Sequence, residues 1–292
     1  MPRKLVVCDL SSIETRVTGW VAGCAGILNV FKEKRDAYID FGTRWFGQSY
    51  DLLNPDYPGI SAAEKANRKD LRQLCKPAVL GCCYGLGGGD YSEDKNGDEI
   101  KTGLFGYSDN MGIPMTREQA HEAVDIYRRT YPEVCNAWRK LERAAVLAVE
   151  TGQRQIACGI FFDCVSPSKL LYVTLPSGRR LHYIRPKLTP SEYGAKLSYE
   201  NNILGGWGRT ATWGGKFTEN VVQAIARDVL AVGMLRARDA GFTIVGHTHD
   251  EIICEEEMLG LEQLRELMIA PMPWAPDLLL DADGYEDTRY HK

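Results

Sequence analysis

Two acidic residues that are far apart in the sequence each stand beside a short strand-like run. Asp9 ends the run RKLVVCD, and Asp250 lies in HTHDE between the strand-like segments 242–246 and 252–257. If the two carboxylates converge in space, they can hold a pair of Mg²⁺ ions about 3.5–4 Å apart, which activate an attacking hydroxyl group and neutralise a phosphate. The pattern therefore predicts phosphoryl-transfer chemistry.

A second set of side chains recurs every fourth residue in a segment with helical spacing. Arg72, Lys76, Leu80 and Tyr84 follow a Ser61–Glu64 capping box. Residues four apart on a helix drift by only about 40° per step, so the four side chains are expected along one helix face. The two cations suit phosphate oxygens and the aromatic ring offers a stacking surface. Such a face suits a nucleoside triphosphate.

The composition is that of a folded, mid-sized protein. The chain has 292 residues, 44% of them hydrophobic and 25% charged, with a formal net charge of -4. These values disfavour a disordered or collagen-like chain. The N-terminal apolar run LVVC is too short for a signal peptide, and no segment approaches the roughly 20 apolar residues of a spanning helix. The nine scattered cysteines are typical of reduced thiols. We expect no membrane association and a cytoplasmic location.

Periodicity predicts the elements that position these side chains. We expect a strand over 3–9 that leads into a helix, and two helices within 116–150 that break near Tyr131-Pro132. The glycine-rich stretch 85–99 is predicted to be a loop. A hairpin is expected around Pro176-Ser177-Gly178, followed by an amphipathic helix over 216–240. A sheet therefore lies in the C-terminal half.

Three of these segments, in this order, resemble the motifs of one enzyme family. DLSSIETRV at 9–17 is similar to motif A of family A (Pol I-type) DNA polymerases, RQLCKPAVLGCCYG at 72–85 to their motif B helix, and HDE at 249–251 to their motif C. The segments LPSGRRLHY, ENVVQAIARD and PWAPDLLLDADGYEDTRY resemble phage members of the family. The resemblance covers nearly the whole chain.

The resemblance implies an α+β fold: a polymerase palm, built of an antiparallel sheet plus helices, with a mainly helical fingers insertion. We expect the first palm segment at 1–28, the fingers at 29–150 and the second palm segment at 151–292. Family members carry a thumb, and usually an exonuclease domain, before motif A, and both are absent from this sequence. We therefore expect the catalytic half of a split polymerase, with a separate chain that supplies the thumb.

The resemblance also implies a role for each matching residue. The metal-binding groups would be Asp9, the backbone carbonyl of Leu10, Asp250 and Glu251. Lys76 would join Asp9 and Asp250 as a catalytic residue, as proton donor to the leaving group. The residues implied to bind the nucleotide are Glu14, Arg72, Lys76, Leu80 and Tyr84, and those implied to contact DNA are Arg16, Gln223 and His249.

Three of these positions need a further remark. Glu14 would be the steric gate that leaves no room for a ribose 2′-hydroxyl. Leu80 stands where well-known members carry Phe or Tyr, which leaves discrimination against dideoxy analogues open. The asparagine expected one turn before Gln223 is replaced by Glu219, which puts that minor-groove contact in doubt.

The function implied is template-directed DNA synthesis: addition of deoxynucleotides (dNTPs) to a primer 3′-hydroxyl on primer–template DNA. Two Mg²⁺ ions would serve as cofactors, and Mn²⁺ can substitute. If the chain is viral, its location would be the host cytoplasm. Two alternatives stay open. One is a single-subunit RNA polymerase, which Glu14 and HDE argue against, and the other is a non-catalytic nucleic-acid-binding accessory subunit.

Overall fold

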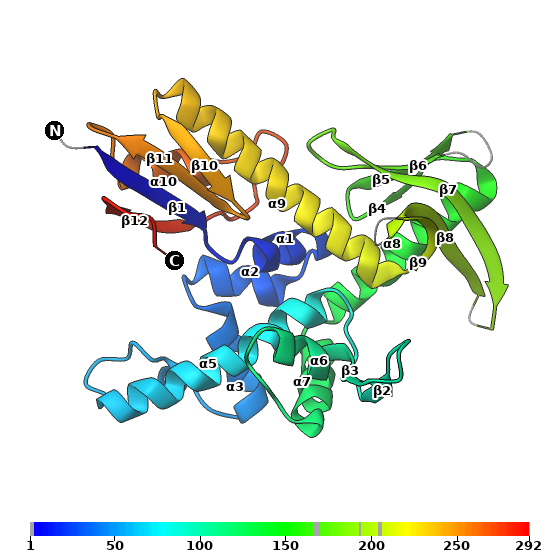
Figure 1. The fold of residues 1–292 in the computed structure, drawn as a ribbon, viewed down its shortest axis with the longest axis horizontal. Helices are drawn as coiled ribbons and strands as arrows, with labels where there is room; N and C mark the ends of the chain where they lie inside the picture. The colour runs from blue at the N-terminus through cyan, green and yellow to red at the C-terminus, as the bar shows by residue number, and fades with distance from the viewer. Residues whose placement is uncertain (1–2, 166–169, 193, 204–205, 292) are drawn as a thin grey trace.

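Strand β1 lies inside a four-stranded antiparallel sheet with the strand order β10-β11-β1-β12. The computed structural model describes residues 3–165, 170–192, 194–203 and 206–291 (Figure 1). Alternate residues of β1, namely Val6, Cys8 and Leu10, are buried in a hydrophobic core, so Asp9 points to the opposite face. The predicted strands beside Asp9 and Asp250 are confirmed. The strands of this sheet are β1 (Lys4–Leu10), β10 (Ile244–Thr248), β11 (Glu251–Glu256) and β12 (Ala282–Asp287).

Three helices pack on the core side of this sheet. The long helix α9 crosses from the four-stranded sheet toward the rest of the molecule (Figure 1), and it buries Phe217, Ile225 and Leu230. Complete burial of one such side chain contributes about 1.5–3 kcal/mol. The predicted amphipathic helix over 216–240 is confirmed. The helices of this layer are α1 (Ile13–Ala22), α9 (Gly214–Asp239) and α10 (Leu261–Ile269).

A second antiparallel sheet has six strands in sequence order. Its β6–β7 turn is closed by a hydrogen bond from the Gly178 amide to the Leu175 carbonyl (2.9 Å), which confirms the predicted hairpin. The sequence predicted a sheet here but not its full extent. The strands are β4 (Gln155–Ala157), β5 (Ile160–Val165), β6 (Leu170–Thr174), β7 (Arg180–Ser191), β8 (Gly194–Ile203) and β9 (Gly206–Thr212).

A helical region forms a second hydrophobic core around the fully buried Tyr127. The Ser61–Glu64 capping box starts α5, which continues through Pro77, and a helix break falls at Tyr131-Pro132, as predicted. The helices here are α2 (Ala25–Lys32), α3 (Ala37–Phe46), α4 (Tyr50–Leu53), α5 (Ala62–Cys83), α6 (Gly103–Asn110), α7 (Arg117–Thr130) and α8 (Pro132–Thr151).

The glycine-rich stretch contains a short hairpin, so the prediction of a loop over 85–99 is wrong in part. Strand β2 (Tyr91–Glu93) pairs with β3 (Glu99–Lys101). The hairpin is closed at its base by Gly89, which has a φ of +89° and where a Cβ would lie 1.9 Å from the Thr102 carbonyl oxygen. Glycine is required there by close backbone packing as well as by conformation.

The two cores meet within single elements. Val134, at the start of α8, packs in the core around Tyr127, whereas Leu141 and Ala145 of the same helix pack in the core of the four-stranded sheet. The predicted domain limits at residues 28 and 150 stay predictions. Within the described part of the chain, every helix is too short or too polar to cross a lipid bilayer.

Candidate active site

Strand pairing brings the two predicted catalytic carboxylates to one edge of the four-stranded sheet. Asp9 is the penultimate residue of β1, and Asp250 lies in the turn between β10 and β11. Asp9 pairs with Glu251 across the β1–β11 ladder, and the Leu10 amide donates a hydrogen bond to the Asp250 carbonyl oxygen (3.1 Å). The register therefore fixes Asp9 and Asp250 as close neighbours, although they are far apart in sequence.

Both carboxylates line a pocket of about 440 Å³ between the sheet and the helical region. Helix α5 contributes Lys76 and Leu80 to the opposite wall, one turn apart, and α1 contributes Glu14. The structure thus brings most of the predicted metal- and nucleotide-binding side chains together around one cavity. The residues that line it are Asp9, Leu10, Ser12, Ile13, Glu14, Tyr38, Lys76, Leu80, Tyr107, Met111, His249 and Asp250.

His249 lies between two carboxylates at the mouth of this pocket. Its Nδ1 atom is 2.9 Å from Asp250 Oδ1, and its Nε2 atom is 3.9 Å from Glu14 Oε1. The hydrogen bond to Asp250 is the main cause that raises the pKa of His249 above its ordinary value. The His249 backbone has a φ of 50°, in the left-handed region, so the tight β10–β11 turn sets where its ring lies.

Gln223 connects residues from three helices behind the pocket. Its side-chain amide on α9 donates hydrogen bonds to Glu14 Oε1 on α1 and to the Tyr84 hydroxyl at the end of α5 (3.4 Å to Tyr84). Burial raises the pKa of Tyr84 well above its ordinary value, so the phenol stays neutral. The amide therefore fixes the Glu14 carboxylate at the side of the pocket.

Arg72 lies outside this pocket, although it shares helix α5 with Lys76. Its Nε and terminal nitrogen atoms donate to Asp36 Oδ2 at 3.0 and 2.7 Å, and its guanidinium lies 5.0 Å from the centre of the Tyr38 ring. Arg72 and Asp36 line a neighbouring pocket of about 530 Å³. The structure does not bring Arg72 together with the carboxylates, which separates the predicted row of side chains.

Sequence reasoning missed the partner that holds Arg72. Asp36 is the N-cap of α3, where its Oδ1 atom accepts hydrogen bonds from the amides of Tyr38 (2.8 Å) and Ile39 (3.0 Å). An aspartate directly before an apolar helical run is a recognisable N-cap signal. Nothing in that signal indicates that the second carboxylate oxygen faces α5.

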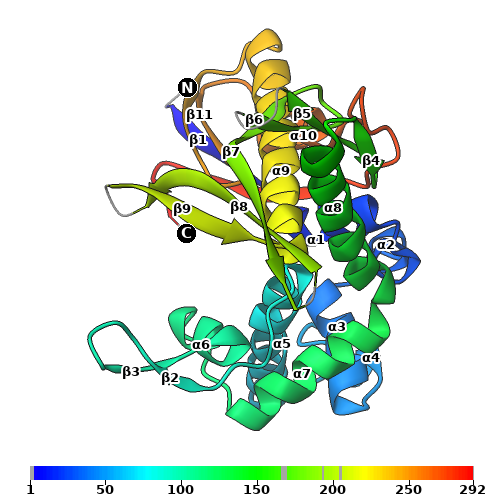
Figure 2. The ribbon, with the colours of Figure 1, turned by 90° about the vertical axis from the view of Figure 1, so that its right-hand side faces the viewer.

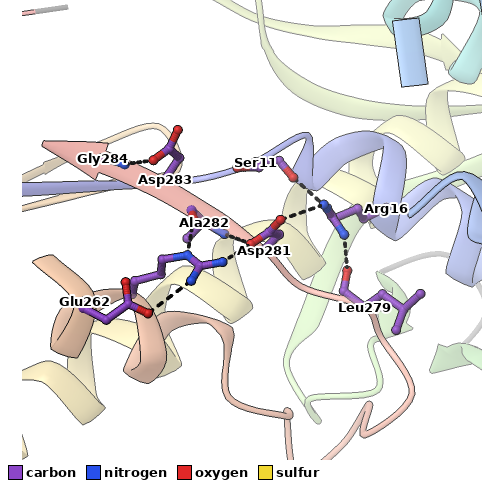
Figure 3. A network of polar contacts seen from close by, with 9 residues as sticks. Ser11, Arg16, Glu262, Leu279, Asp281, Ala282, Asp283 and Gly284 are labelled. Carbon is purple, nitrogen blue, oxygen red and sulfur yellow. Dashed lines mark hydrogen bonds and ion pairs between the residues drawn. The ribbon is translucent and has the colours of Figure 1, made fainter. Parts of the chain in front are cut away.

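Arg16 lies in a structural position, and its predicted contact with DNA stays a prediction. Its side chain is 9% exposed. The guanidinium donates to the carbonyl oxygens of Ser11 (2.7 Å) and Leu279 (3.1 Å) and lies 3.8 Å from Asp281 (Figure 3). It also lies over the Phe31 ring. These contacts tie the start of α1 to the segment before β12. The guanidinium is therefore engaged within the protein in this structure.

Tyr290 and Asp283, two residues near the C-terminus that were not predicted, lie beside the predicted carboxylates. Glu251 is 5% exposed, and the Tyr290 hydroxyl donates a hydrogen bond to its Oε1 atom (3.1 Å). On the other side of β1, Asp283 of β12 pairs directly with Asp9. Directly paired residues of antiparallel strands point to the same face, so Glu251, Asp9 and Asp283 form a row of carboxylates. The segment DADGYED does not by itself indicate that Asp283 lies beside Asp9, because this follows only from the register of β1 and β12.

The carboxylate oxygens at this edge of the sheet suit a hard divalent cation that takes its remaining ligands from outside the protein. In the described residues, no group of three or more His, Cys, Asp or Glu side chains is gathered for metal binding. Mg²⁺ typically uses one or two carboxylates and takes its remaining ligands from water and substrate phosphates. Asp9 and Asp250, which both line the pocket, match that requirement.

Comparisons with known proteins agree with this geometry. The chain is 34% identical over 292 residues to a DNA polymerase of Bacillus phage SP02, covering 98% of this chain and 41% of that protein. It is 23% identical over 290 residues to DNA polymerase I of Lactococcus lactis, covering 97% of this chain and 25% of that protein. No family model matches.

A solved structure shows the same fold. The POL domain of Pol1 from M. smegmatis, in complex with a DNA primer–template and a dNTP, aligns with a TM-score of 0.58 and 20% identity. The match covers 98% of this chain and 39% of that chain. The chain thus spans less than half the length of the proteins it matches. Together with the motifs, these similarities show that the chain is similar to a part of a phage DNA polymerase and to a part of DNA polymerase I.

Proposed function

We propose that this chain carries out template-directed DNA synthesis, in which a primer 3′-hydroxyl attacks the α-phosphorus of a dNTP and pyrophosphate leaves. The observation that carries the proposal is that Asp9 and Asp250 line one pocket opposite Lys76. Phosphoryl transfer depends chiefly on positioning and charge stabilisation, and this arrangement offers carboxylates on one wall and a cation on the other. The relationship to phage DNA polymerase supports the same reaction.

Each residue of the pocket has a proposed task. Asp9, Asp250 and the Leu10 carbonyl would hold Mg²⁺, with Glu251 in support. Bound there, Mg²⁺ or Mn²⁺ would lower the pKa of the primer hydroxyl and neutralise phosphate charge. Lys76 would donate a proton to the departing pyrophosphate. His249, which protrudes at the pocket mouth, would contact the primer terminus.

The other predicted contacts concern the nucleotide and the template. The Glu14 carboxylate, fixed by Gln223, would exclude a ribose 2′-hydroxyl, which favours DNA over RNA synthesis. Leu80 and Tyr84 would border the nascent base pair, and Gln223 would face the minor groove. Arg72 would bind triphosphate oxygens only after its ion pair with Asp36 is broken. A separate chain that supplies a thumb stays part of the proposal.

Primer extension by the purified chain, with Mg²⁺ and all four dNTPs, tests the proposal. We expect synthesis that Asp250→Ala abolishes. The matched control is Glu255→Gln, which changes a carboxylate on the adjoining strand β11 that is 38% exposed and paired with Arg3. If Asp250→Ala retains synthesis within about tenfold of the parent chain, the proposed site is wrong. If both variants lose synthesis equally, the loss reflects a disturbance of the β10–β11 hairpin and not the removal of a pocket carboxylate.

A further inference from the structure

The outer face of strand β9 carries exposed aromatic and basic side chains in alternation. Trp207, Arg209 and Ala211 are exposed, and Trp213 follows directly after the strand. Trp207 is 61% exposed and Trp213 is 51% exposed. The intervening Thr212 is 2% exposed and faces the core. Strand alternation therefore places the two indoles and the guanidinium on one solvent-facing side, the β9 stripe (Trp207, Arg209, Ala211 and Trp213).

A carboxylate on the neighbouring strand holds this stripe in a fixed geometry. Glu200 of β8 pairs directly with Arg209 and accepts from its guanidinium (3.0 Å), from the Trp207 indole Nε1 (3.0 Å) and from Arg185 (2.9 Å). Because the indole is bound at its edge, its flat face stays available. Because two guanidiniums share one carboxylate, the cluster keeps a net positive charge.

The charge of the surrounding strands is opposite to that of the whole chain. Residues 180–212 hold five of the 35 lysines and arginines but only two of the 39 aspartates and glutamates. The chain as a whole has a formal net charge of -4. A basic sheet surface on an acidic protein is complementary to a polyanion.

The stripe leads toward the predicted active site. Strand β9 runs into the start of α9, where a Cβ on Gly215 would lie 2.1 Å from the Tyr84 carbonyl oxygen and 3.0 Å from Trp213 Nε1. Trp213 is thus close to the end of α5 that borders the nascent base pair in the proposed function. Figure 2 shows that the β8–β9 ribbon and the β2–β3 hairpin project to the same side of the molecule.

We propose that the β9 stripe binds single-stranded DNA, as a platform for the unpaired template strand. The inference rests on the proposed function, which supplies the template. Exposed indole faces stack on bases only where those bases are unpaired, and arginine binds the intervening phosphates. Both contacts are independent of sequence. A duplex, whose base faces are covered by neighbouring pairs, offers the stripe only its phosphates.

Fluorescence anisotropy of a labelled 20-nucleotide oligothymidine tests the proposal, with the full chain and without metal or dNTP. We expect the chain to bind the single strand more tightly than a blunt duplex of equal length. Trp207→Ala and Arg209→Ala should each weaken single-strand binding about fivefold or more. Equal binding by the parent chain and both variants overturns the proposal, as does tighter binding of the blunt duplex.

Two further variants exclude indirect effects. Trp207→Phe keeps an aromatic face but loses the indole nitrogen, and it should retain most of the binding. Arg154→Ala removes another exposed arginine beside the same sheet, paired with Asp163 at 2.7 Å, and it should leave single-strand binding unchanged. If Arg154→Ala weakens single-strand binding as much as Arg209→Ala does, the effect reflects general positive charge, and the proposal for the β9 stripe is wrong.

Primer extension separates this proposal from the proposed function. With a long unpaired template overhang, we expect a lower KM for primer–template than with a two-nucleotide overhang, and Trp207→Ala should remove that preference. If synthesis proceeds but the overhang preference is absent or unchanged in Trp207→Ala, the platform is wrong and the polymerase proposal stands. If the parent chain binds the oligothymidine through the stripe but makes no DNA, the stripe stands and the proposal that this chain synthesises DNA by itself fails.

Discussion

The sheet edge and helix α5 position their charged side chains in different ways. At the sheet edge, Asp9 and Asp250 come from opposite ends of the sequence, and the β1–β11 register makes them neighbours. On α5, Arg72 and Lys76 are only one turn apart, yet Lys76 lines the pocket of Asp9 and Asp250, whereas Arg72 binds Asp36 in an adjoining pocket. Strand register fixes which residues meet, whereas helix spacing fixes only a direction. The neighbouring helix decides which cavity each side chain enters.

The largest expected effect comes from removing the divalent cations that the carboxylates at the sheet edge are proposed to hold. Removal of divalent cations with EDTA should abolish DNA synthesis, by about a thousandfold or more, because the two carboxylates alone cannot neutralise phosphate charge. Mg²⁺ or Mn²⁺ should restore it, measured by primer extension. Zinc and calcium are added in the same assay for comparison with Mg²⁺ and Mn²⁺. Full activity in EDTA would contradict the proposed use of Asp9 and Asp250.

The two cations of α5 should differ in effect. Lys76→Ala should lower kcat by about a hundredfold or more, the range of general acid catalysis, whereas Arg72→Ala should chiefly raise the KM for dNTP, by about tenfold. Steady-state kinetics on one primer–template measures both. The control is Arg68→Ala. Arg68 lies one turn before Arg72 on α5 and donates a hydrogen bond to the Asp51 carbonyl. Equal losses of kcat in Lys76→Ala and Arg72→Ala would remove the distinction between the two pockets.

Glu14 tests whether the side of the pocket excludes ribose. Glu14→Ala should lower the preference for deoxynucleotides over ribonucleotides by at least about tenfold, because the space for a 2′-hydroxyl opens. Incorporation of a single ribonucleotide by each variant measures the effect. Glu14→Gln keeps the volume of the side chain and should keep the exclusion. If Glu14→Ala still rejects ribonucleotides as well as the parent chain, another residue is the gate.

Arg16 should have the smallest effect on catalysis and a clear effect on stability. Arg16→Met should lower the free energy of unfolding by about 1–3 kcal/mol, because the carbonyls of Ser11 and Leu279 lose their buried donor. Denaturant unfolding measures the change. Arg44→Met, at an exposed helix position, is the control and should stay within about 0.5 kcal/mol. An unchanged stability with a large loss of DNA affinity would contradict the structural role and support the predicted DNA contact.

The sequence carried local signals that the structure confirms. The apolar run before Asp9, the Ser61–Glu64 capping box and the break at Tyr131-Pro132 depend on neighbouring residues alone, so periodicity and capping chemistry predict them. The hairpin within the glycine-rich stretch depends on the contact between Gly89 and Thr102, which composition does not reveal.

The site was predictable where a family motif and a strand end coincide, as at Asp9 and Asp250. It was not predictable where a distant segment decides the environment. Arg16 is buried by the segment that carries Leu279, and Glu251 is held by Tyr290 near the C-terminus. Both partners follow from tertiary packing, and nothing in the local pattern of either residue specifies them.

The central claim is that Asp9 and Asp250 act as one site. The most direct test is single-turnover incorporation of one dNTP by Asp9→Ala, Asp250→Ala and the double variant, with primer–template binding measured in parallel. Residues that act as a unit are non-additive, so we predict that the double variant loses no more activity than either single variant and that all three still bind DNA. Losses that multiply in the double variant would contradict a shared site.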